Sequence, residues 1–458
     1  MKIITWFFGL IVIAAAGIYF MLFSAIGNAI LAPIVEGKIQ EQTQLDSKLK
    51  VFSLSMNEFE VLLELNQDNT VFAKGSYSLF EQSFDTVYDV KFNKLETLEP
   101  LTKKPLKGPL FTDGTAKGNM AFMKIDGKSD VAFSATVYHV ELTNLDPTSI
   151  IAKIQNANLV SLLQLAGEKP YAQGKIDVDV NFKNIKVHEL DGNILLSTKE
   201  GKLNNILMSK EFELDIPATK FSMNLDAKLK GDDVNYVYAL HSNLAKITSA
   251  GNIVPEPLKV DVTYSLDIKE LAVLKPIIKE DVRGPLTLDG TAKGTQKNMI
   301  VEGVSDLASS DTQFSAILKD NKPVSLNASI ENLKIEKLLY MLKQPHYGDG
   351  ILSLNIDMDD LRKGNLKGHV ISNIKQGLLD SAYLTKEQGF KTMMPKTTFN
   401  VITNTTLNGD MTETKLNLKS TLIALDIEKA KYNLQHKSIE SDFKATVANL
   451  DNLFFITE

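Results

Sequence analysis

The feature that most constrains the fold of this chain is an eleven-residue phrase that occurs twice. Gly108–Gly118 reads GPLFTDGTAKG, and Gly284–Gly294, 176 positions later, reads GPLTLDGTAKG, so nine of the eleven residues are identical. The same offset relates Tyr88 to Tyr264 and extends over most of the chain. A long unit written twice is typical of a modular, repetitive architecture.

Composition excludes several classes of protein. The chain has 458 residues, of which 23% are charged and 44% apolar, the balance of a folded protein. A net charge of -6 without a basic segment argues against a nucleic-acid partner. The absence of cysteine excludes disulfides, thiolate zinc sites and thiol chemistry.

The N-terminus contains a long uncharged stretch, Ile3–Ala25, of 23 residues. As a helix it would rise about 34 Å, enough for a hydrocarbon core of about 30 Å. We predict a transmembrane anchor over residues 1–26, with Lys2 on the cytoplasmic side. The alternative is a cleaved signal peptide, whose apolar region is usually shorter. The residues assigned to the membrane anchor are Ile3, Trp6, Phe7, Leu10, Ile13, Tyr19 and Leu22.

From about Lys50 onward apolar and polar residues alternate with period two. Such alternation predicts strands with one apolar and one wet face, as in antiparallel sheets. The candidate residues for lining an apolar groove are Ile176, Val178, Val180, Val260, Val262, Tyr264, Leu266, Leu352, Leu354, Ile356, Leu416 and Leu418. Tight hairpin turns are predicted at Asp113-Gly114, Asp126-Gly127, Asp191-Gly192, Lys230-Gly231, Asp289-Gly290 and Asn408-Gly409.

Helical signals are few and short. They lie in a neck over residues 27–49, interrupted at Pro33, and at Leu95–Leu98, Leu271–Leu274, 332–342 and from Asp146-Pro147 through Ile154. The spacing of Phe443, Leu450 and Leu453 repeats that of Tyr88, Leu95 and Leu98, so a third copy of the unit begins near the C-terminus. The predicted segments are therefore 1–26 (anchor), 27–49 (neck), 50–261 and 262–440 (two β-repeat regions) and 441–458 (start of a third repeat).

The apolar face of these strands must be covered, because so few helices are predicted. Two arrangements satisfy this. The sheet can close into a packed sandwich or barrel, or the face can line a groove that accepts acyl chains. The repetition favours the groove, because stacked units extend one apolar surface. The predicted fold is mostly β, an elongated, twisted antiparallel sheet that forms an apolar groove.

No catalytic, cofactor or metal site is predicted, and we do not expect an enzyme. The six histidines are scattered. Gly127-Lys128-Ser129 lacks the upstream glycine of a phosphate loop, and the second copy does not keep its lysine. Asn355, Asp357 and Asp359 lack the glycine of a calcium loop. The duplicated phrase itself is interpreted as a joint where a helix leads into the next strands.

The order of parts resembles the AsmA-like superfamily of bacterial envelope proteins. It consists of one N-terminal membrane helix, a short neck, and strands punctuated by Leu-x-x-Leu helices and Gly-x-Leu-x-x-x-Gly. The resemblance implies a conduit for phospholipid between the two membranes, anchored by a single pass in the inner membrane with its body in the periplasm. We therefore expect membrane phospholipids, and as a second class other envelope proteins, as partners, with no nucleic acid and no nucleotide. An anchored scaffold with a closed core and no lipid is the alternative function.

Overall fold

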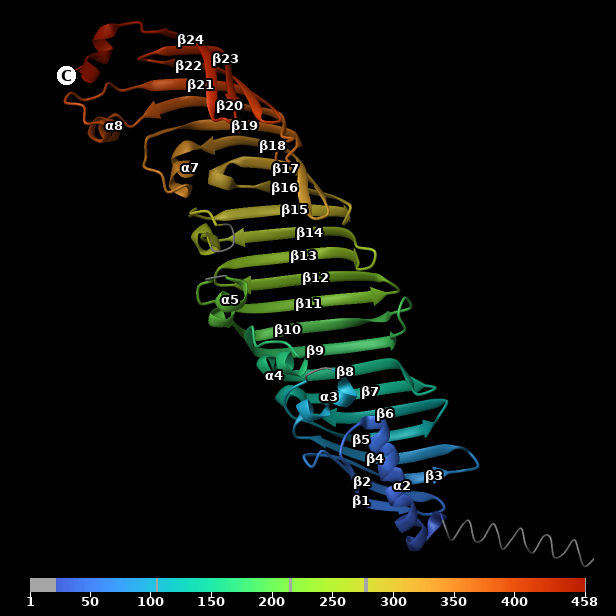
Figure 1. The fold of residues 1–458 in the computed structure, drawn as a ribbon. Coiled ribbons are helices and arrows are strands. Elements are labelled where there is room, and N and C mark those ends of the chain that lie inside the picture. The colour runs from blue at the N-terminus through green and yellow to red at the C-terminus, as the bar shows by residue number, and fades with distance from the viewer. Residues whose placement is uncertain (1–21, 104–105, 214–215, 276–278, 458) are drawn as a thin grey trace, which may run out of the picture. The chain divides into compact units, whose positions relative to one another are not determined.

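The computed structural model describes residues 22–457 except 104–105, 214–215 and 276–278. The described chain is mostly strand, with short helices between strand groups. It divides into two compact units: unit 1 contains the chain up to Phe212 together with Ala218–Asp232, and unit 2 contains Glu213–Pro217 together with the chain from Asp233 onward. Each unit is a long, open antiparallel sheet in which every strand pairs with the next in sequence (Figure 1).

In the part of the chain that the structure describes, unit 1 holds eleven strands and six short or medium-length helices. The strands are β1 (Ser47–Leu54), β2 (Glu58–Leu65), β3 (Asn69–Ser78), β4 (Ser83–Phe92), β5 (Leu110–Asn119), β6 (Phe122–Ser129), β7 (Ala135–Thr143), β8 (Asp146–Asn158), β9 (Ala172–Asn184), β10 (Asp191–Leu203) and β11 (Lys220–Lys230). The helices are α2 (Ala25–Thr43), η1 (Leu95–Leu98), α3 (Glu99–Thr102), η2 (Val131–Phe133), α4 (Leu159–Leu165) and α5 (Asn205–Phe212).

Unit 2 repeats this arrangement. Its strands are β12 (Asp233–Ser242), β13 (Ala245–Val254), β14 (Lys259–Ile268), β15 (Leu286–Thr295), β16 (Asn298–Ser305), β17 (Asp311–Lys319), β18 (Lys322–Lys334), β19 (Gly348–Asp360), β20 (Lys367–Leu379), β21 (Thr398–Asn408), β22 (Met411–Ser420), β23 (Ala424–Asn433) and β24 (Ser438–Thr446). Its helices are η3 (Leu271–Leu274), η4 (Leu307–Ser309), α7 (Ile335–Met341), α8 (Ser381–Gln388), η5 (Leu450–Leu453) and α9 (Phe454–Thr457).

Strand register places the apolar residues of neighbouring strands on a common face. In unit 1, Val178 pairs with Leu196 on one side and Ile154 on the other, while the intervening Asp177 and Asp179 point to the opposite face. We call these the apolar face and the polar face. The apolar face of unit 1 carries Val61, Val71, Val90, Ile125, Val140, Ile154, Val178, Leu196 and Leu225. That of unit 2 carries Leu240, Leu266, Leu288, Leu326, Ile356, Val370, Val401, Leu418 and Leu425.

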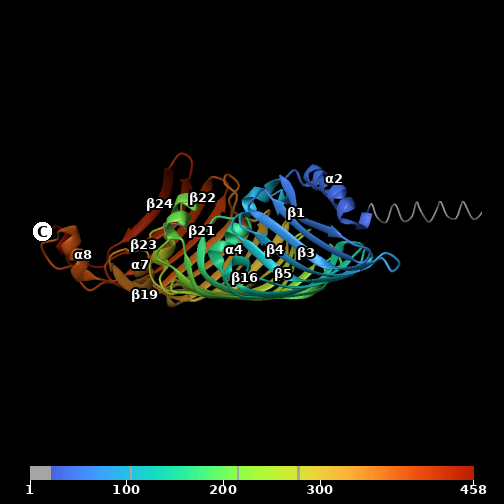
Figure 2. The same cartoon turned by 90° about the horizontal axis from the view of Figure 1, so that it is seen from below.

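Short helices cover the apolar face at one end of the strands only. In unit 1, Leu159 and Leu162 of α4 pack against Ile176 and Ile154. In unit 2, Met341 and Leu338 of α7 pack against Ile330 and Leu333. Figure 2 shows these helices lying within the curve of the strands of their own unit. Most buried apolar side chains gather in clusters at the short helices. Among the described residues, each unit therefore has compact clusters at its margin and no continuous second layer.

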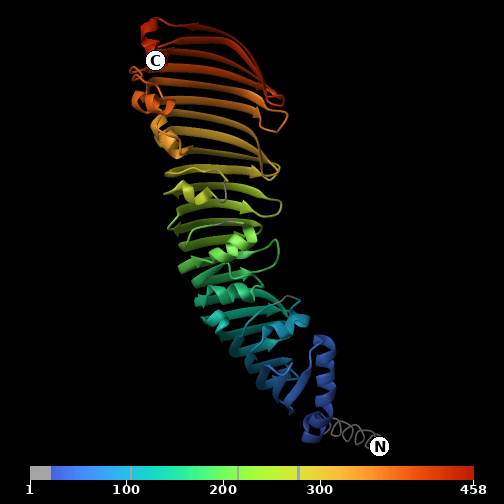
Figure 3. The ribbon, with the colours of Figure 1, turned by 60° about the vertical axis from the view of Figure 1, so that its left-hand side comes forward.

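Helix α2 covers the outer edge of β1 (Figure 3). The side chain of Asn28 donates to the carbonyl of Leu54 at 3.0 Å and accepts from its amide at 3.2 Å, and Glu36 accepts from the amide of Leu49 at 2.9 Å. These bonds occupy backbone groups that an edge strand otherwise presents for pairing. The prediction of a helix in the neck is confirmed, but its interruption is wrong: α2 continues through Pro33.

All four turns predicted at Asp-Gly pairs are wrong. The pairs at 113–114, 126–127 and 289–290 lie inside β5, β6 and β15, and the pair at 191–192 begins β10. Glycine is required there for a different reason. A Cβ on Gly114 would stand 2.6 Å from the hydroxyl of Tyr88, and one on Gly290 would stand 2.5 Å from that of Tyr264. The glycines make room for an aromatic ring on the neighbouring strand. The turns at Gly231 and Gly409 are confirmed, each with φ of 61°.

The helix predicted to start at Asp146-Pro147 is also wrong. Residues Asp146–Asn158 form β8, and the helix follows as α4. Ile150 and Ile154 lie on the apolar face, opposite Val140 and Thr136 of β7. Cross-strand packing of branched side chains therefore outweighs the N-capping signal of Asp-Pro. The other predicted helices are confirmed in η1, η3 and α7, although α7 begins only at Ile335.

The boundary between the two compact units differs from the boundary drawn on the repeat. The chain changes from one unit to the other within residues 213–232, whereas the repeat regions predicted from the sequence join at 261–262. A sequence period can be started at any of its positions, while a compact unit ends where contacts are few. The equivalent elements η2 and η4 share an unusual backbone conformation. Ala132 and Ala308 are both left-handed, with φ of 52° and 51°.

Candidate functional site: the apolar faces

The candidate site in each unit is the part of the apolar face that the helices leave uncovered. The structure places all twelve apolar positions predicted from the sequence on such a face: three on β9 in unit 1, and four on β14, three on β19 and two on β22 in unit 2. Ile176 is buried, with 4% of its surface exposed, because it belongs to the cluster under α4. The other eleven are only half-buried, although they lie in the interior of the sheet.

Half-burial distinguishes the two arrangements that the sequence left open. Inward-facing residues of a packed sandwich or a filled barrel are covered by a second layer. Here Val180 and Val262 are only half-buried, and neither belongs to the clusters that pack under the helices. The apolar faces are therefore open in the described structure.

The apolar face of unit 1 is interrupted by three hydroxyl groups that the sequence reasoning missed. The hydroxyl of Tyr138 lies 2.6 Å from that of Tyr88 and 2.6 Å from that of Thr112. The two rings lie over Gly114 and Gly127, which have no side chain to displace them. Burial, together with the hydrogen bond to Tyr138, raises the pKa of Tyr88 well above its ordinary value. Tyr88 thus stays neutral, and the three hydroxyl groups bond to one another.

Unit 2 has no such trio at the equivalent positions. Phe314 stands in place of Tyr138 and Leu288 in place of Thr112. Tyr264 remains, and its hydroxyl donates to the carbonyl of Glu302 at 3.2 Å. Burial raises the pKa of Tyr264 as well. The apolar face of unit 2 is consequently more uniform.

The polar face of unit 2 contains a hollow of about 1000 Å³ across β15 to β20. Its lining combines polar side chains, among them Glu302, Asn327, Asn355 and Asp357, with apolar ones such as Val304 and Ile371. Ser329 donates to Asn355 at 3.1 Å, so the side chains partly satisfy one another. Ser315 donates to Glu302 at 3.4 Å, so these two lining side chains also pair with each other. Among the described residues, none of the lining side chains belongs to a group that could hold a metal ion.

The residues considered for other chemistry have structural partners. Ser129 of the Gly-Lys-Ser segment donates to the carbonyl of Phe111, and Ser305 makes the same bond to Thr287 in unit 2. Asn355 and Asp357 point from β19 to the polar face. Across the part of the chain that the structure describes, no group of three His, Asp or Glu side chains could hold a metal ion.

His346 has the most defined surroundings of the histidines. Its Nε2 lies 2.7 Å from Asp349, and its Nδ1 lies 3.3 Å from Asp380, which also caps α8 through the amide of Tyr383. The hydrogen bond to Asp349 is the main cause that raises the pKa of His346. His346 therefore joins the start of β19 to the start of α8.

Residues 1–21 of the predicted membrane anchor, 1–26, lie outside the described residues, and of the side chains named for it only Leu22 is described. In the described ranges, no helix has the length and apolar character needed to cross a membrane. Comparison with protein-family models, with curated proteins and with solved structures finds no match for this chain.

Proposed function

We propose that the apolar faces hold phospholipid acyl chains and that the protein shields or transfers phospholipid in the bacterial envelope. The observation that carries this proposal is the half-burial of apolar residues in the interior of both sheets, such as Val180 and Val262. An acyl chain laid on such a face would give these side chains the second layer that they lack. Burying each methylene stabilises the complex by about 0.8 kcal/mol.

The proposal includes the position of the protein. The uncharged stretch Ile3–Ala25 anchors it in the inner membrane, and the β units lie in the periplasm, as the resemblance to AsmA-like proteins implies. The sequence contains no nucleotide-binding motif, so the direction of transfer comes from lipid gradients or partner proteins. Phospholipids are bound by shape and apolarity, without a cofactor.

The experiment is photo-crosslinking of the full chain in bacterial cells. A photoreactive phenylalanine analogue replaces Val180 or Val262, both of which lie on the apolar face away from the packed clusters. On irradiation, we expect covalent adducts with the mass of phospholipid, detected by mass spectrometry of the purified protein.

The matched control positions are Leu195 and Ile402. Both are apolar and exposed, yet they lie on the polar face, opposite Asp179 and Asn417. We expect no lipid adduct at these two positions. The proposal fails if adducts are absent at 180 and 262, or if all four positions react equally.

A second candidate function, an anchored scaffold that recruits other envelope proteins, is favoured by one observation. The nine residues of β24 are all exposed, and β24 offers an edge for pairing. This function does not need lipid on the apolar faces, and the absence of lipid adducts would leave it as the better proposal.

A further inference from the structure

Strand β24 occupies the position of β4 and β14 in a third copy of the repeat. Phe443 corresponds to Tyr88 and Tyr264, and the helix η5 that follows corresponds to η1 and η3. In both complete copies the next strand is the duplicated glycine-rich phrase: β4 pairs with β5, and β14 pairs with β15. Among the described strands, β24 pairs only with β23.

Among the described residues, no glycine lies opposite the aromatic residue of β24, unlike its equivalents in β4 and β14. Tyr88 lies directly opposite Gly114, and Tyr264 lies directly opposite Gly290. Each ring is close enough to exclude a Cβ at the glycine. Phe443 lies on the same face of β24 and is 70% exposed.

All three strands, β4, β14 and β24, carry an acidic residue at the same position. Asp85 of β4 lies opposite Lys117 and forms an ion pair of 2.6 Å with it, and Asp261 of β14 forms one of 2.8 Å with Lys293. At the equivalent position β24 carries Glu440. Among the described residues, no ion pair involves Glu440.

The short helix that follows β24, η5, also lacks a contact that η1 and η3 make. Leu95 of η1 and Leu271 of η3 are 4% and 6% exposed, packed in clusters that include Leu110 and Leu286 from the following strand. The equivalent Leu450 is 74% exposed. Phe443, Glu440 and Leu450 thus lack, among the described residues, the contacts that the next strand provides in the two complete copies.

We propose that the free edge of β24 binds an extended segment of a partner protein that resembles the duplicated phrase. The segment pairs antiparallel with β24, presents glycine opposite Phe443, lysine opposite Glu440, and a leucine four residues before the glycine. Backbone bonds supply affinity, and these three positions supply register and specificity. This interaction is independent of lipid binding by the apolar faces.

The test uses a labelled synthetic peptide of residues 282–295, VRGPLTLDGTAKGT, added to the full chain in nonionic detergent. We expect saturable binding by fluorescence anisotropy. A peptide with Gly290→Val, which cannot lie under the Phe443 ring, should bind at least about ten-fold more weakly. Failure of the parent peptide to bind, or equal binding of the two peptides, would overturn the proposal.

Variants of the protein locate the site. Phe443→Asp should abolish binding, whereas Phe443→Tyr should preserve it, because tyrosine holds this position in both complete copies. Phe80→Asp changes an even more exposed aromatic residue, in a turn far from β24 in sequence, and should leave the affinity unchanged. Since these side chains are exposed, all three variants should keep the circular dichroism of the parent. If Phe80→Asp weakens binding as much as Phe443→Asp, the β24 site is wrong.

A charge exchange and a crosslink test the register. Glu440→Lys should weaken binding about two- to five-fold, the effect of an exposed ion pair, and a peptide with Lys293→Glu should restore it. The chain has no cysteine, so a cysteine at Lys444 is unique. By analogy with Ser265 and Asp289 of β14 and β15, it should form a disulfide with a peptide carrying Asp289→Cys. A disulfide formed equally well with a Thr287→Cys peptide would contradict the proposed register.

Discussion

Units 1 and 2 build the same backbone with different side-chain chemistry. Where unit 1 uses hydrogen bonds, unit 2 often uses apolar contacts. Asn69, which is fully buried, donates to Thr97 at 2.9 Å and accepts from the amide of Lys94. At the positions equivalent to Asn69 and Thr97, unit 2 has Ala245 and Val273.

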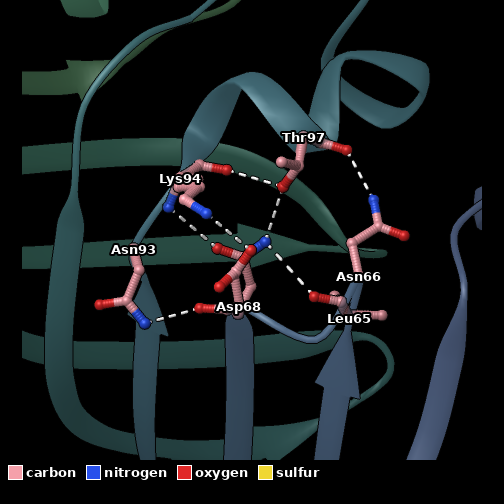
Figure 4. A network of polar contacts seen from close by, with 7 residues as sticks. Leu65, Asn66, Asp68, Asn93, Lys94 and Thr97 are labelled. Atoms are coloured by element: carbon pink, nitrogen blue, oxygen red, sulfur yellow. Dashed lines mark hydrogen bonds and ion pairs between the residues drawn. The ribbon is translucent and has the colours of Figure 1, made fainter.

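Figure 4 shows how this polar network ties the turn between β2 and β3 to η1. Asn66 donates to the carbonyl of Thr97 at 2.8 Å, and Lys94 forms an ion pair of 3.0 Å with Asp68. In unit 2 the same helix is held by Glu270, which accepts from the amides of Ala272 and Gly284.

The comparison teaches which residues define the fold. The glycines under aromatic rings, the buried leucines of η1 and η3, and the left-handed alanines occur in both units. Hydrogen-bonding partners are exchangeable, because an apolar pair of similar shape can replace a satisfied polar pair at little net cost. Four predictions test this comparison.

The largest effect is expected for Gly290→Val in unit 2, and equally for Gly114→Val in unit 1. A Cβ at Gly290 would stand 2.1 Å from the carbonyl oxygen of Glu302, so the strands must shift apart. We expect a loss of about 3 kcal/mol in the free energy of unfolding, measured by denaturant titration. Gly37→Ala in α2, where no atom lies within 4 Å, should instead stabilise by about 0.5–1 kcal/mol. An unchanged transition in Gly290→Val would show that the shared glycines are dispensable.

The second prediction contrasts the covered edge of β1 with the free edge of β24. Replacing Asn28 and Glu36 together by alanine removes three bonds to the backbone of β1. We expect a loss of about 2 kcal/mol and association that grows with protein concentration, measured by sedimentation velocity. Glu41→Ala, which breaks only an exposed ion pair on the same helix, is the control. If the double variant stays as dispersed as the control, α2 does not protect the edge.

The third prediction concerns Tyr138→Phe, which gives unit 1 the residue that unit 2 has at the equivalent position. Tyr138→Phe removes the hydroxyl that joins Tyr88 to Thr112, at a cost of about 1 kcal/mol. Because the pKa of Tyr88 is raised by folding, its contribution is present below about pH 10, where the unfolded tyrosine is neutral, and is lost as the pH rises above that value. The variant should lower the pKa of Tyr88, measured by ultraviolet absorbance, and soften the alkaline loss of stability. If the pKa of Tyr88 is the same in the variant, the hydrogen bond to Tyr138 does not contribute to it.

The smallest effect is expected for His346→Ala in unit 2. Because the pKa of His346 is raised, its contribution is fully present below about pH 6.5 and is lost as the pH rises through the folded pKa. The pair is half-exposed, so we expect a loss of about 0.5 kcal/mol at pH 5.5 and less at pH 8.5. The equivalent position in unit 1 is Pro170, so Pro170→Ala should show no such pH dependence. Equal losses at both pH values would rule out the ionic role.

The amino-acid sequence determined the repeat, the strands and the short helices of this protein. Alternation with period two identifies the apolar face of β9 and β14, because successive side chains of a strand point to opposite sides. The offset between the two copies of the phrase identifies equivalent residues without any structure. The residues predicted to start a third copy fall in the end of β24 and in η5.

Only the tertiary structure decided what the glycines do and whether the apolar face is covered. Asp-Gly is a strong local turn signal, and the ring of Tyr88 above Gly114 comes from a strand more than twenty residues away in sequence. The choice between an open face and a closed core depends on whether a second layer meets the sheet, which alternation along one strand cannot reveal. The exposure of Val180, Val262 and Phe443 answers that question, because burial is a property of the neighbours that a residue acquires in space.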